Sequence, residues 1–447
     1  MDNVKLIVIS TSFYRAIYRL KNDVLQNVFL ESKLNKSPKI NDIYLAQVSE
    51  VNASIGGVFV NLGNNQKAFL KLGKSKDALR VGEKVIVQVT KEETLPHKLA
   101  VVTRDIGINV SLIRFKPSSS NIIFSKKLTD QDRINIVEAL EYNHEDGNGF
   151  MIRSLYKHSM LDDLVAEYKT INAKWTEIIN KKNIGLLWGF DYLENVVLSN
   201  SKLFPDEIIS DSLDDFKSVK EVTSKYGIKA SIHDKKEDIL DYYELREYLN
   251  EISNNHMYLN DYLSLIFYEH DAFNYIDVDF SGELSMNNSK EEDLYKANMD
   301  ILPHIVHQIL LRNLSGQILI DVLKVTNKQY RNNILAQAKK MFDFSEVKTT
   351  VLGFSNLGLL EVSRQKNQDS FNVLLSKSFE ARAFMCLLDI KKLISDGVKN
   401  ISIDINSKDL DKLQSLASKD LEELNLRLEN KIKFNIDETI KTPKVKL

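Results

Sequence analysis

Three aspartates in two short apolar segments are the residues of this sequence best placed to do chemistry. Asp277 and Asp279 lie in FNYIDVDF, and Asp321 lies in QILIDVL. Side chains alternate between the two faces of a β-strand, so Asp277 and Asp279 are expected on one face, about 7 Å apart. Carboxylates held close together among apolar neighbours repel each other unless a cation or a shared proton lies between them.

The segment between these two strands is expected to bring the carboxylates together. Residues 289–314 have a helical pattern that opens with a Ser-x-x-Glu capping box and ends before Gly316. A strand, a helix and a second strand form a crossover whose strands run parallel, which places Asp321 near Asp277. Oxygen-only ligands favour magnesium over zinc, so the sequence predicts a Mg²⁺ site here. The alternative is that these aspartates are solvated strand ends or helix caps.

Residues 43–103 contain five short β segments separated by turn residues: IYLAQVSEV, GVFVNLG, AFLKL, KVIVQVT and LAVVT. This spacing predicts a small antiparallel barrel. The period-two rule places Phe59 on the outer face, and it places Phe69 there between Lys67 and Lys71. An exposed aromatic ring beside lysines suits single-stranded RNA, because the ring stacks on a base and the lysines attract phosphates. The alternative is that a neighbouring domain covers both rings.

The remaining segments predict a mixed α/β protein. Residues 1–35 have the pattern of strands, and residues 202–255 are charged and weakly periodic. Residues 105–200 contain two helical patterns among four strand-like pieces: NIIFS, GFMIRS, GLLWGF and ENVVLS. A helix over 327–341, strands in VKTTVLG and LLEVSRQ, a helix over 377–395 and a strand in NISIDI complete the expected elements.

Composition limits the class of protein. The formal net charge of -2 provides no overall attraction to nucleic acid, so an RNA site must be a local patch. No apolar run approaches the roughly 20 residues of a membrane-spanning helix, and the start of the chain lacks the pattern of a secretory signal. The one cysteine, Cys386, forbids an intrachain disulfide and suits a reducing compartment, so we expect a cytoplasmic protein.

Several motifs, in order, resemble the ribonuclease E and ribonuclease G family: YIDVDF, a helix running from KAN to LLRNLSG, ILIDVL and LGLLEVSRQ. Residues 43–69 resemble an S1-type domain, an OB-fold barrel that binds single-stranded nucleic acid. The resemblance implies an α/β multidomain protein with these parts: a split RNase H-like domain (1–36 and 105–200), an inserted S1-type OB domain (37–104), a 5′-sensor region (201–255), a DNase I-like catalytic domain (256–370) and a small C-terminal domain (371–447).

The resemblance also implies a function. The family cuts single-stranded RNA in RNA processing with Mg²⁺, leaving a 5′-phosphate and a 3′-hydroxyl, and its magnesium ligands match Asp277 and Asp321. Asp279 replaces a family asparagine that supports a metal-bound water. Phe59, Phe69 and Lys98 match residues that grip RNA near the cut.

Arg153 and Ser154 match an Arg-Thr pair that receives the 5′-monophosphate of RNA, which a guanidinium and a hydroxyl can bind. The alternative for Arg153 is a structural ion pair at a strand end.

Three departures from the family pattern matter. The two cysteines that link protomers through zinc are absent, so any homodimer is not held by such a zinc link. Lys324 stands where an acid is usual, and the glycine-rich stretch beside Lys98 is lost. These changes motivate a second hypothesis, in which the chain is a degenerate relative that binds RNA or ribosomal precursors without cutting.

Overall fold

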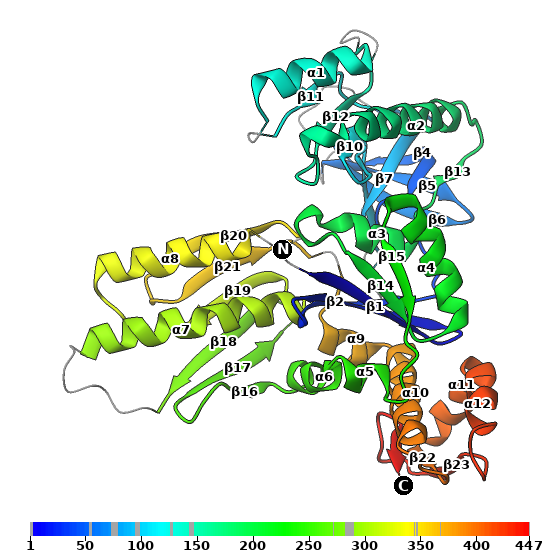
Figure 1. The fold of residues 1–447 in the computed structure, drawn as a ribbon, viewed down its shortest axis with the longest axis vertical. Helices are drawn as coiled ribbons and strands as arrows, with labels where there is room; N and C mark the ends of the chain where they lie inside the picture. Colours follow the sequence, from blue (N-terminus) through cyan, green and yellow to red (C-terminus); the bar gives the residue numbers. More distant parts are fainter. Residues whose placement is uncertain are drawn as a thin grey trace. The chain divides into compact units, whose positions relative to one another are not determined.

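The protein is described by a computed structural model over residues 3–52, 56–72, 79–93, 99–125, 128–142, 147–270, 272–281, 290–343, 345, 347–366 and 368–446. It divides into two compact units (Figure 1). Unit 1 comprises residues 1–35 and 205–447, and unit 2 comprises residues 36–204. Within the described residues, no helix combines the length and the apolar character needed to cross a membrane.

The first sheet of unit 1 joins the start of the chain to a segment beyond residue 204. Its strands are β1 (Val4–Ser10), β2 (Tyr14–Lys21), β3 (Val24–Ser32), β14 (Glu207–Ser210) and β15 (Lys229–Ile232), in the order β15-β14-β1-β2-β3. β14 runs parallel to both β1 and β15, whereas β2 is antiparallel to its neighbours. The family resemblance implies that residues 105–200 belong to the same domain as residues 1–36, whereas the further strands of this sheet come from residues 207–232.

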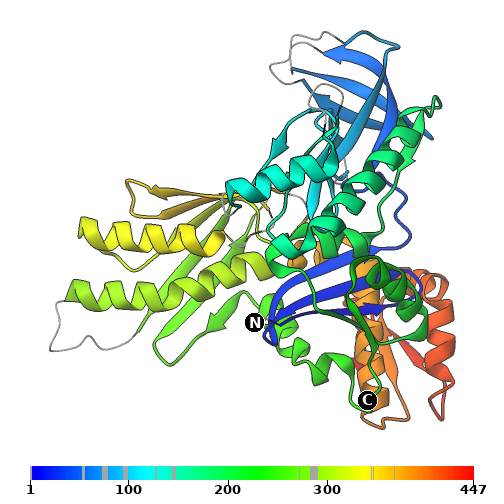
Figure 2. The same cartoon turned by 45° about the horizontal axis from the view of Figure 1, so that its top comes forward.

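The second sheet of unit 1 carries the predicted carboxylates. It consists of β16 (His256–Tyr258), β17 (Leu263–Glu269), β18 (Asn274–Phe280), β19 (Gly316–Asp321), β21 (Leu360–Arg364) and β20 (Thr349–Phe354), hydrogen-bonded in that order. Two helices, α7 (Lys290–Leu311) and α8 (Lys328–Phe342), lie side by side along it (Figures 1 and 2). The predicted crossover is therefore confirmed, although Ser289 of the predicted capping box lies outside the described residues.

The remaining elements of unit 1 are helical, apart from a small sheet near the C-terminus. The helices are α4 (Leu213–Tyr226), α5 (Ile239–Tyr242), α6 (Leu245–Ser253), α9 (Phe371–Lys377), α10 (Phe379–Ser395), α11 (Ser407–Leu416) and α12 (Ser418–Asn425), and the strands are β22 (Ser402–Ile405), β23 (Lys433–Ile436) and β24 (Lys444–Lys446). The sequence predicts a separate small domain for 371–447. In the structure, Phe384 and Ile403 of this segment share one hydrophobic core with Tyr18 of the first sheet.

Unit 2 contains the predicted barrel (Figure 2). Its strands β4 (Ile43–Asn52), β5 (Gly57–Gly63), β6 (Gln66–Lys71), β8 (Ala100–Thr103) and β7 (Lys84–Lys91) pair in that order, and β7 closes the ring by pairing with β4. A sixth strand, β13 (Gly185–Trp188), adds to the outer side of β4. β6 and β8 pair in parallel, so the prediction of an antiparallel barrel is wrong for this pair of strands. A closed ring of five strands is compatible with an OB-type domain.

The rest of unit 2 is a small α/β layer. Its sheet has the order β11 (Ile122–Ile123), β12 (Gly149–Ile152), β10 (Ile113–Lys116) and β9 (Ile108–Asn109), and its helical elements are α1 (Asp130–Leu140), η2 (His158–Met160), α2 (Leu161–Ile179), α3 (Tyr192–Ser199) and η3 (Ser201–Leu203).

The strand predicted for ENVVLS is wrong, because this segment lies in α3. The Asp191 side chain caps the helix by accepting from the Glu194 N–H at 3.1 Å. Leu193, Val196 and Val197, which are spaced for one face of a helix, are buried.

Candidate active site

The two predicted metal ligands lie on neighbouring parallel strands at the same level. Asp277 of β18 and Asp321 of β19 are Cα partners in the parallel ladder. Partners in such a ladder point to the same face, and adjacent strands are about 4.8 Å apart. Both side chains are half-buried, whereas the residues that alternate with them, such as Val278 and Ile320, are buried beneath α7 and α8. The structure thus brings Asp277 and Asp321 together on the face opposite the helices.

Side-chain hydrogen bonds hold this register at both ends of β19. The Asn274 amide donates to the Ser315 carbonyl oxygen at 2.8 Å, which ties the start of β18 to the start of β19. Beyond Asp321, the buried Asn298 of α7 donates to the Leu323 carbonyl at 2.7 Å and accepts from the Leu323 N–H at 2.9 Å. A one-residue slip would break these bonds and turn Asp321 toward the helices.

Further acidic groups share the carboxylate face. Asp279, two residues beyond Asp277, is exposed on the same face, as the sequence predicts. Glu361 of β21 is the Cα partner of Leu319, which stands two residues before Asp321, so Glu361 also faces this side. None of these four carboxylates forms an ion pair with a Lys, Arg or His in the described part of the chain. The face is therefore strongly negative.

Burial and neighbouring charges both affect the pKa of the Asp277 carboxyl. Burial raises the pKa of the Asp277 carboxyl, and the nearby charges of Asp321 and Asp279 raise it further. The Tyr275 hydroxyl donates to Asp321 Oδ2 at 2.9 Å. Burial, together with this hydrogen bond, raises the pKa of Tyr275 to about 12. Sequence reasoning missed Tyr275, although the same period-two rule places it on the face of Asp277.

The donor set at this site is made of carboxylate oxygens. The described residues contain no group of three or more His, Cys, Asp or Glu side chains arranged to hold a metal. Magnesium is commonly held by one or two carboxylates, with water and substrate phosphates completing its coordination. A pair of repelling carboxylates on an open face matches that pattern.

The barrel in unit 2 carries the predicted aromatic face. Phe59 of β5 and Phe69 of β6 are Cα partners, and their ring centroids are 5.6 Å apart. Both are half-buried, and Lys67 and Lys71 beside them are exposed. The predicted alternation is confirmed, because the intervening aliphatic residues fill the barrel core. Lys98 lies outside the described residues.

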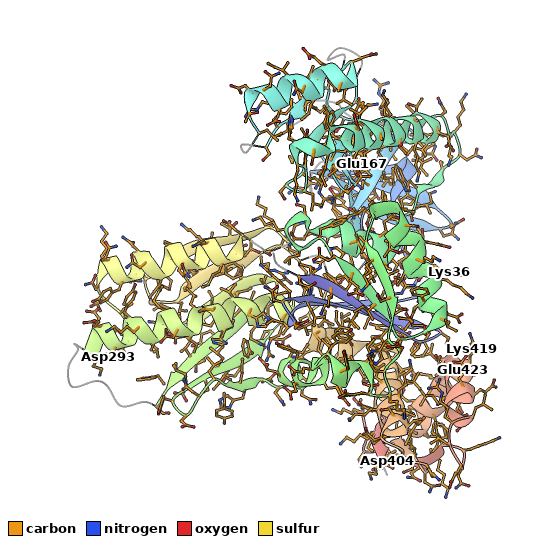
Figure 3. The ribbon with its side chains drawn as sticks, in the orientation of Figure 1. Lys36, Glu167, Asp293, Asp404, Lys419 and Glu423 are labelled. Carbon is orange, nitrogen blue, oxygen red and sulfur yellow. The ribbon has the colours of Figure 1, made fainter. Side chains whose placement is uncertain are left out.

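Arg153 and Ser154 follow β12, where they contact the backbone and side chains of unit 2. The Arg153 guanidinium donates to the Leu198 carbonyl at 2.7 Å and to the Val110 carbonyl. The Ser154 hydroxyl lies 2.7 Å from that of Ser201. The turn next to Val110 is also held by Glu167 of α2 (Figure 3), which accepts from the Ser111 and Leu112 N–H groups. Part of the Arg153 guanidinium therefore supports the fold by donating to these two backbone carbonyls.

Unit 1 also contains a cavity of about 520 Å³ at the carboxyl ends of β1, β14 and β15. Lys419 and Glu423 of α12 (Figure 3) lie in its wall. It is lined by none of the predicted site residues, so it is distinct from the carboxylate face.

The two units thus combine a helix-backed sheet that presents paired carboxylates with a five-stranded barrel that presents paired aromatic rings. This is the combination expected of the multidomain family that the sequence resembles. The chain belongs to the Ribonuclease E/G family, whose model matches residues 109–367. The matched region includes both carboxylate strands and Arg153.

Individual relatives are similar over most of their length. Ribonuclease G of Haemophilus influenzae is 24% identical over 84% of this chain and 82% of its own. Ribonuclease G of Escherichia coli is 24% identical over 83% of this chain and 81% of its own. A ribonuclease E/G-like protein of Pyropia yezoensis is 24% identical over 76% of this chain and 72% of its own.

The first prediction concerns the packing of Phe69 on Gly57. A Cβ atom at Gly57 would lie 2.2 Å from Phe69 Cζ and 2.9 Å from the Leu70 carbonyl oxygen. Gly57→Ala should therefore displace the Phe69 ring and lower the free energy of unfolding by about 1–3 kcal/mol, which urea titration measures. In the double variant with Phe69→Ala the ring clash is gone. The double variant should therefore lose less unfolding free energy than the two single variants lose in total. Strict additivity would show that the ring does not pack on Gly57.

Proposed function

We propose that the chain is a magnesium-dependent, cytoplasmic endoribonuclease that cuts single-stranded RNA in ribosomal RNA maturation or messenger RNA decay. Membership of the family and likeness to proteins named Ribonuclease G support the nuclease activity. The observation that carries the proposal is the in-register pairing of Asp277 with Asp321 on an open sheet face. The proposal includes an RNase H-like fold for the first sheet and a DNase I-like fold for the second.

In this proposal Asp277 and Asp321 would hold the Mg²⁺ ion, and the exposed Asp279 would orient water on the same face. The bound ion supplies electrostatic stabilisation of the charge that develops on the phosphate and favours deprotonation of water. Water attacks phosphorus, the bond from phosphorus to O3′ breaks, and the departing oxygen takes a proton. The products are a 5′-phosphate and a 3′-hydroxyl.

The barrel is proposed to hold the RNA strand. Phe59 and Phe69 offer two adjacent rings for stacking, and Lys67 and Lys71 supply positive charge beside them. This local charge matters because the whole chain is slightly negative. Lys98 is assigned to the same surface by the family resemblance alone.

Arg153 and Ser154 are proposed to favour RNA with a 5′-monophosphate. The planar guanidinium of Arg153 has the donor geometry that suits a phosphate. Ser154 is exposed and retains a hydroxyl donor.

The second prediction tests the carboxylate pair. Asp277→Asn and Asp321→Asn should each lower the rate of cleavage roughly 100-fold or more, because each removes charge that holds the ion. The substrate is a 5′-monophosphorylated, AU-rich single-stranded oligonucleotide, assayed with magnesium or with chelator.

Asp300→Asn is the matched control, because Asp300 is an exposed aspartate on α7 and not on the carboxylate face. Binding of the RNA should persist in all three variants. Equal cleavage by Asp277→Asn and the wild type would refute the site. If the wild type retains RNA but never cuts it, the chain is the non-cleaving RNA-binding relative that Lys324 suggests.

The third prediction concerns the barrel. Phe69→Ala should weaken RNA binding by about 1–3 kcal/mol, because one stacking surface is lost. Fluorescence anisotropy with labelled oligonucleotide measures the change, and thermal unfolding provides the control. A large fall in melting temperature with unchanged RNA affinity would show that Phe69 serves the barrel and not the RNA.

The fourth prediction separates the two roles of Arg153. The wild type should cut 5′-monophosphorylated RNA faster than 5′-hydroxyl RNA. Arg153→Lys should reduce that ratio about tenfold, because lysine lacks the planar donor fork. Ser154→Ala should reduce it less. If Arg153→Lys slows both substrates equally and lowers the melting temperature, Arg153 acts only through the carbonyls of Val110 and Leu198.

A further inference from the structure

Tyr275 is the one residue on the carboxylate face that donates a hydrogen bond to a predicted metal ligand, within the ranges that the structure describes. Its hydroxyl donates to Asp321 Oδ2 at 2.9 Å. The Cα partner of Tyr275 is Leu319, so the side chain reaches diagonally across two residues of β19 to Asp321. This contact joins the strand of Asp277 to the carboxylate of Asp321.

The hydrogen bond from Tyr275 suits a negatively charged face, because its donor is a neutral hydroxyl. Four carboxylates, those of Asp277, Asp279, Asp321 and Glu361, lie on this side of the sheet, and none is paired with a described cationic side chain. A lysine or arginine at position 275 would neutralise Asp321 and compete with a metal ion. A neutral hydroxyl instead occupies one oxygen of Asp321 and leaves its negative charge in place.

A second tyrosine supports the first. Tyr268 of β17 is the Cα partner of Tyr275, and the two ring centroids are 5.9 Å apart with the planes tilted by 44°. Tyr268 is 45% exposed, and its hydroxyl has no hydrogen bond to any described residue. Because β17 and β19 flank β18, Tyr268 packs against Tyr275 on the side away from Asp321.

We propose that Tyr275 is a positioning residue that fixes the Asp321 carboxylate so that its free oxygen and the Asp277 carboxylate can share one divalent cation. This inference rests on the proposed function. Groups that hydrogen-bond a metal ligand typically change metal affinity 10–100-fold when they are removed. Tyr275 orients its ligand from within the same sheet and does not contact the RNA phosphate.

The test compares Tyr275→Phe with Tyr268→Phe in the full chain. Each variant loses one hydroxyl and keeps its ring, but only the Tyr275 hydroxyl bonds Asp321. Binding of Mn²⁺, measured by electron paramagnetic resonance, should weaken about tenfold in Tyr275→Phe and stay unchanged in Tyr268→Phe. The Mg²⁺ concentration for half-maximal RNA cleavage should rise by a similar factor, while the rate at saturating Mg²⁺ stays near that of the wild type.

The outcomes distinguish this inference from the proposed function. If the wild type binds Mn²⁺ and cuts RNA while the two variants have equal Mn²⁺ affinity, the positioning role is refuted and the nuclease stands. If Tyr275→Phe lowers the rate at saturating Mg²⁺ without changing Mn²⁺ affinity, the hydroxyl acts on something other than ion binding, which also refutes the role. A wild type that neither binds Mn²⁺ nor cuts RNA would overturn both.

Discussion

The parallel register between β18 and β19 is the constraint on which the carboxylate face depends. Asp277 and Asp321 are 44 residues apart in sequence, and they meet only because these two strands pair at this level. A shift by one residue would turn the acidic side chain of β19 toward the apolar underside of α7. The buried Asn298 opposes that shift by satisfying both backbone groups of Leu323, so a polar residue inside the helix layer helps to set the geometry of charges on the opposite face.

Several elements of the fold show what the sequence can and cannot predict. Periodicity and a capping motif predicted the crossover, the shared face of Asp277 and Asp279, and all five barrel strands, because each depends on local alternation and turn residues. ENVVLS was misassigned because a short apolar run fits a strand or a buried helix equally well, and only the Asp191 cap distinguishes them. The pairing of β1 with β14 was not predicted, because nothing local indicates which distant strand completes a sheet. The Tyr275 contact required the diagonal geometry of two paired strands.

The two surfaces proposed to contact RNA, the barrel face and the carboxylate face, carry charges of opposite sign. The barrel offers rings beside exposed lysines in unit 2, whereas the sheet in unit 1 offers four carboxylates without cationic partners among the described residues. A polyanion gains from the first surface directly, but it can approach the second only when a cation offsets the repulsion. The proposed function therefore assigns RNA binding and phosphate chemistry to surfaces of opposite charge, in a chain whose net charge is -2.

The first sheet has a consequence for how the chain is made. The Val4 N–H donates to Asp206 Oδ2 at 2.8 Å, and these two residues are 202 positions apart in sequence. β14, which begins at Glu207, pairs with β1. Ribosomes add about 5–20 residues per second, so roughly 10–40 s separate the emergence of β1 from that of its partner. During that interval the hairpin of β1 and β2 has an open edge of the kind that aggregates. Unit 2, which is continuous in sequence, is made during that interval, so the time needed to synthesise it sets how long the edge of β1 lacks its partner.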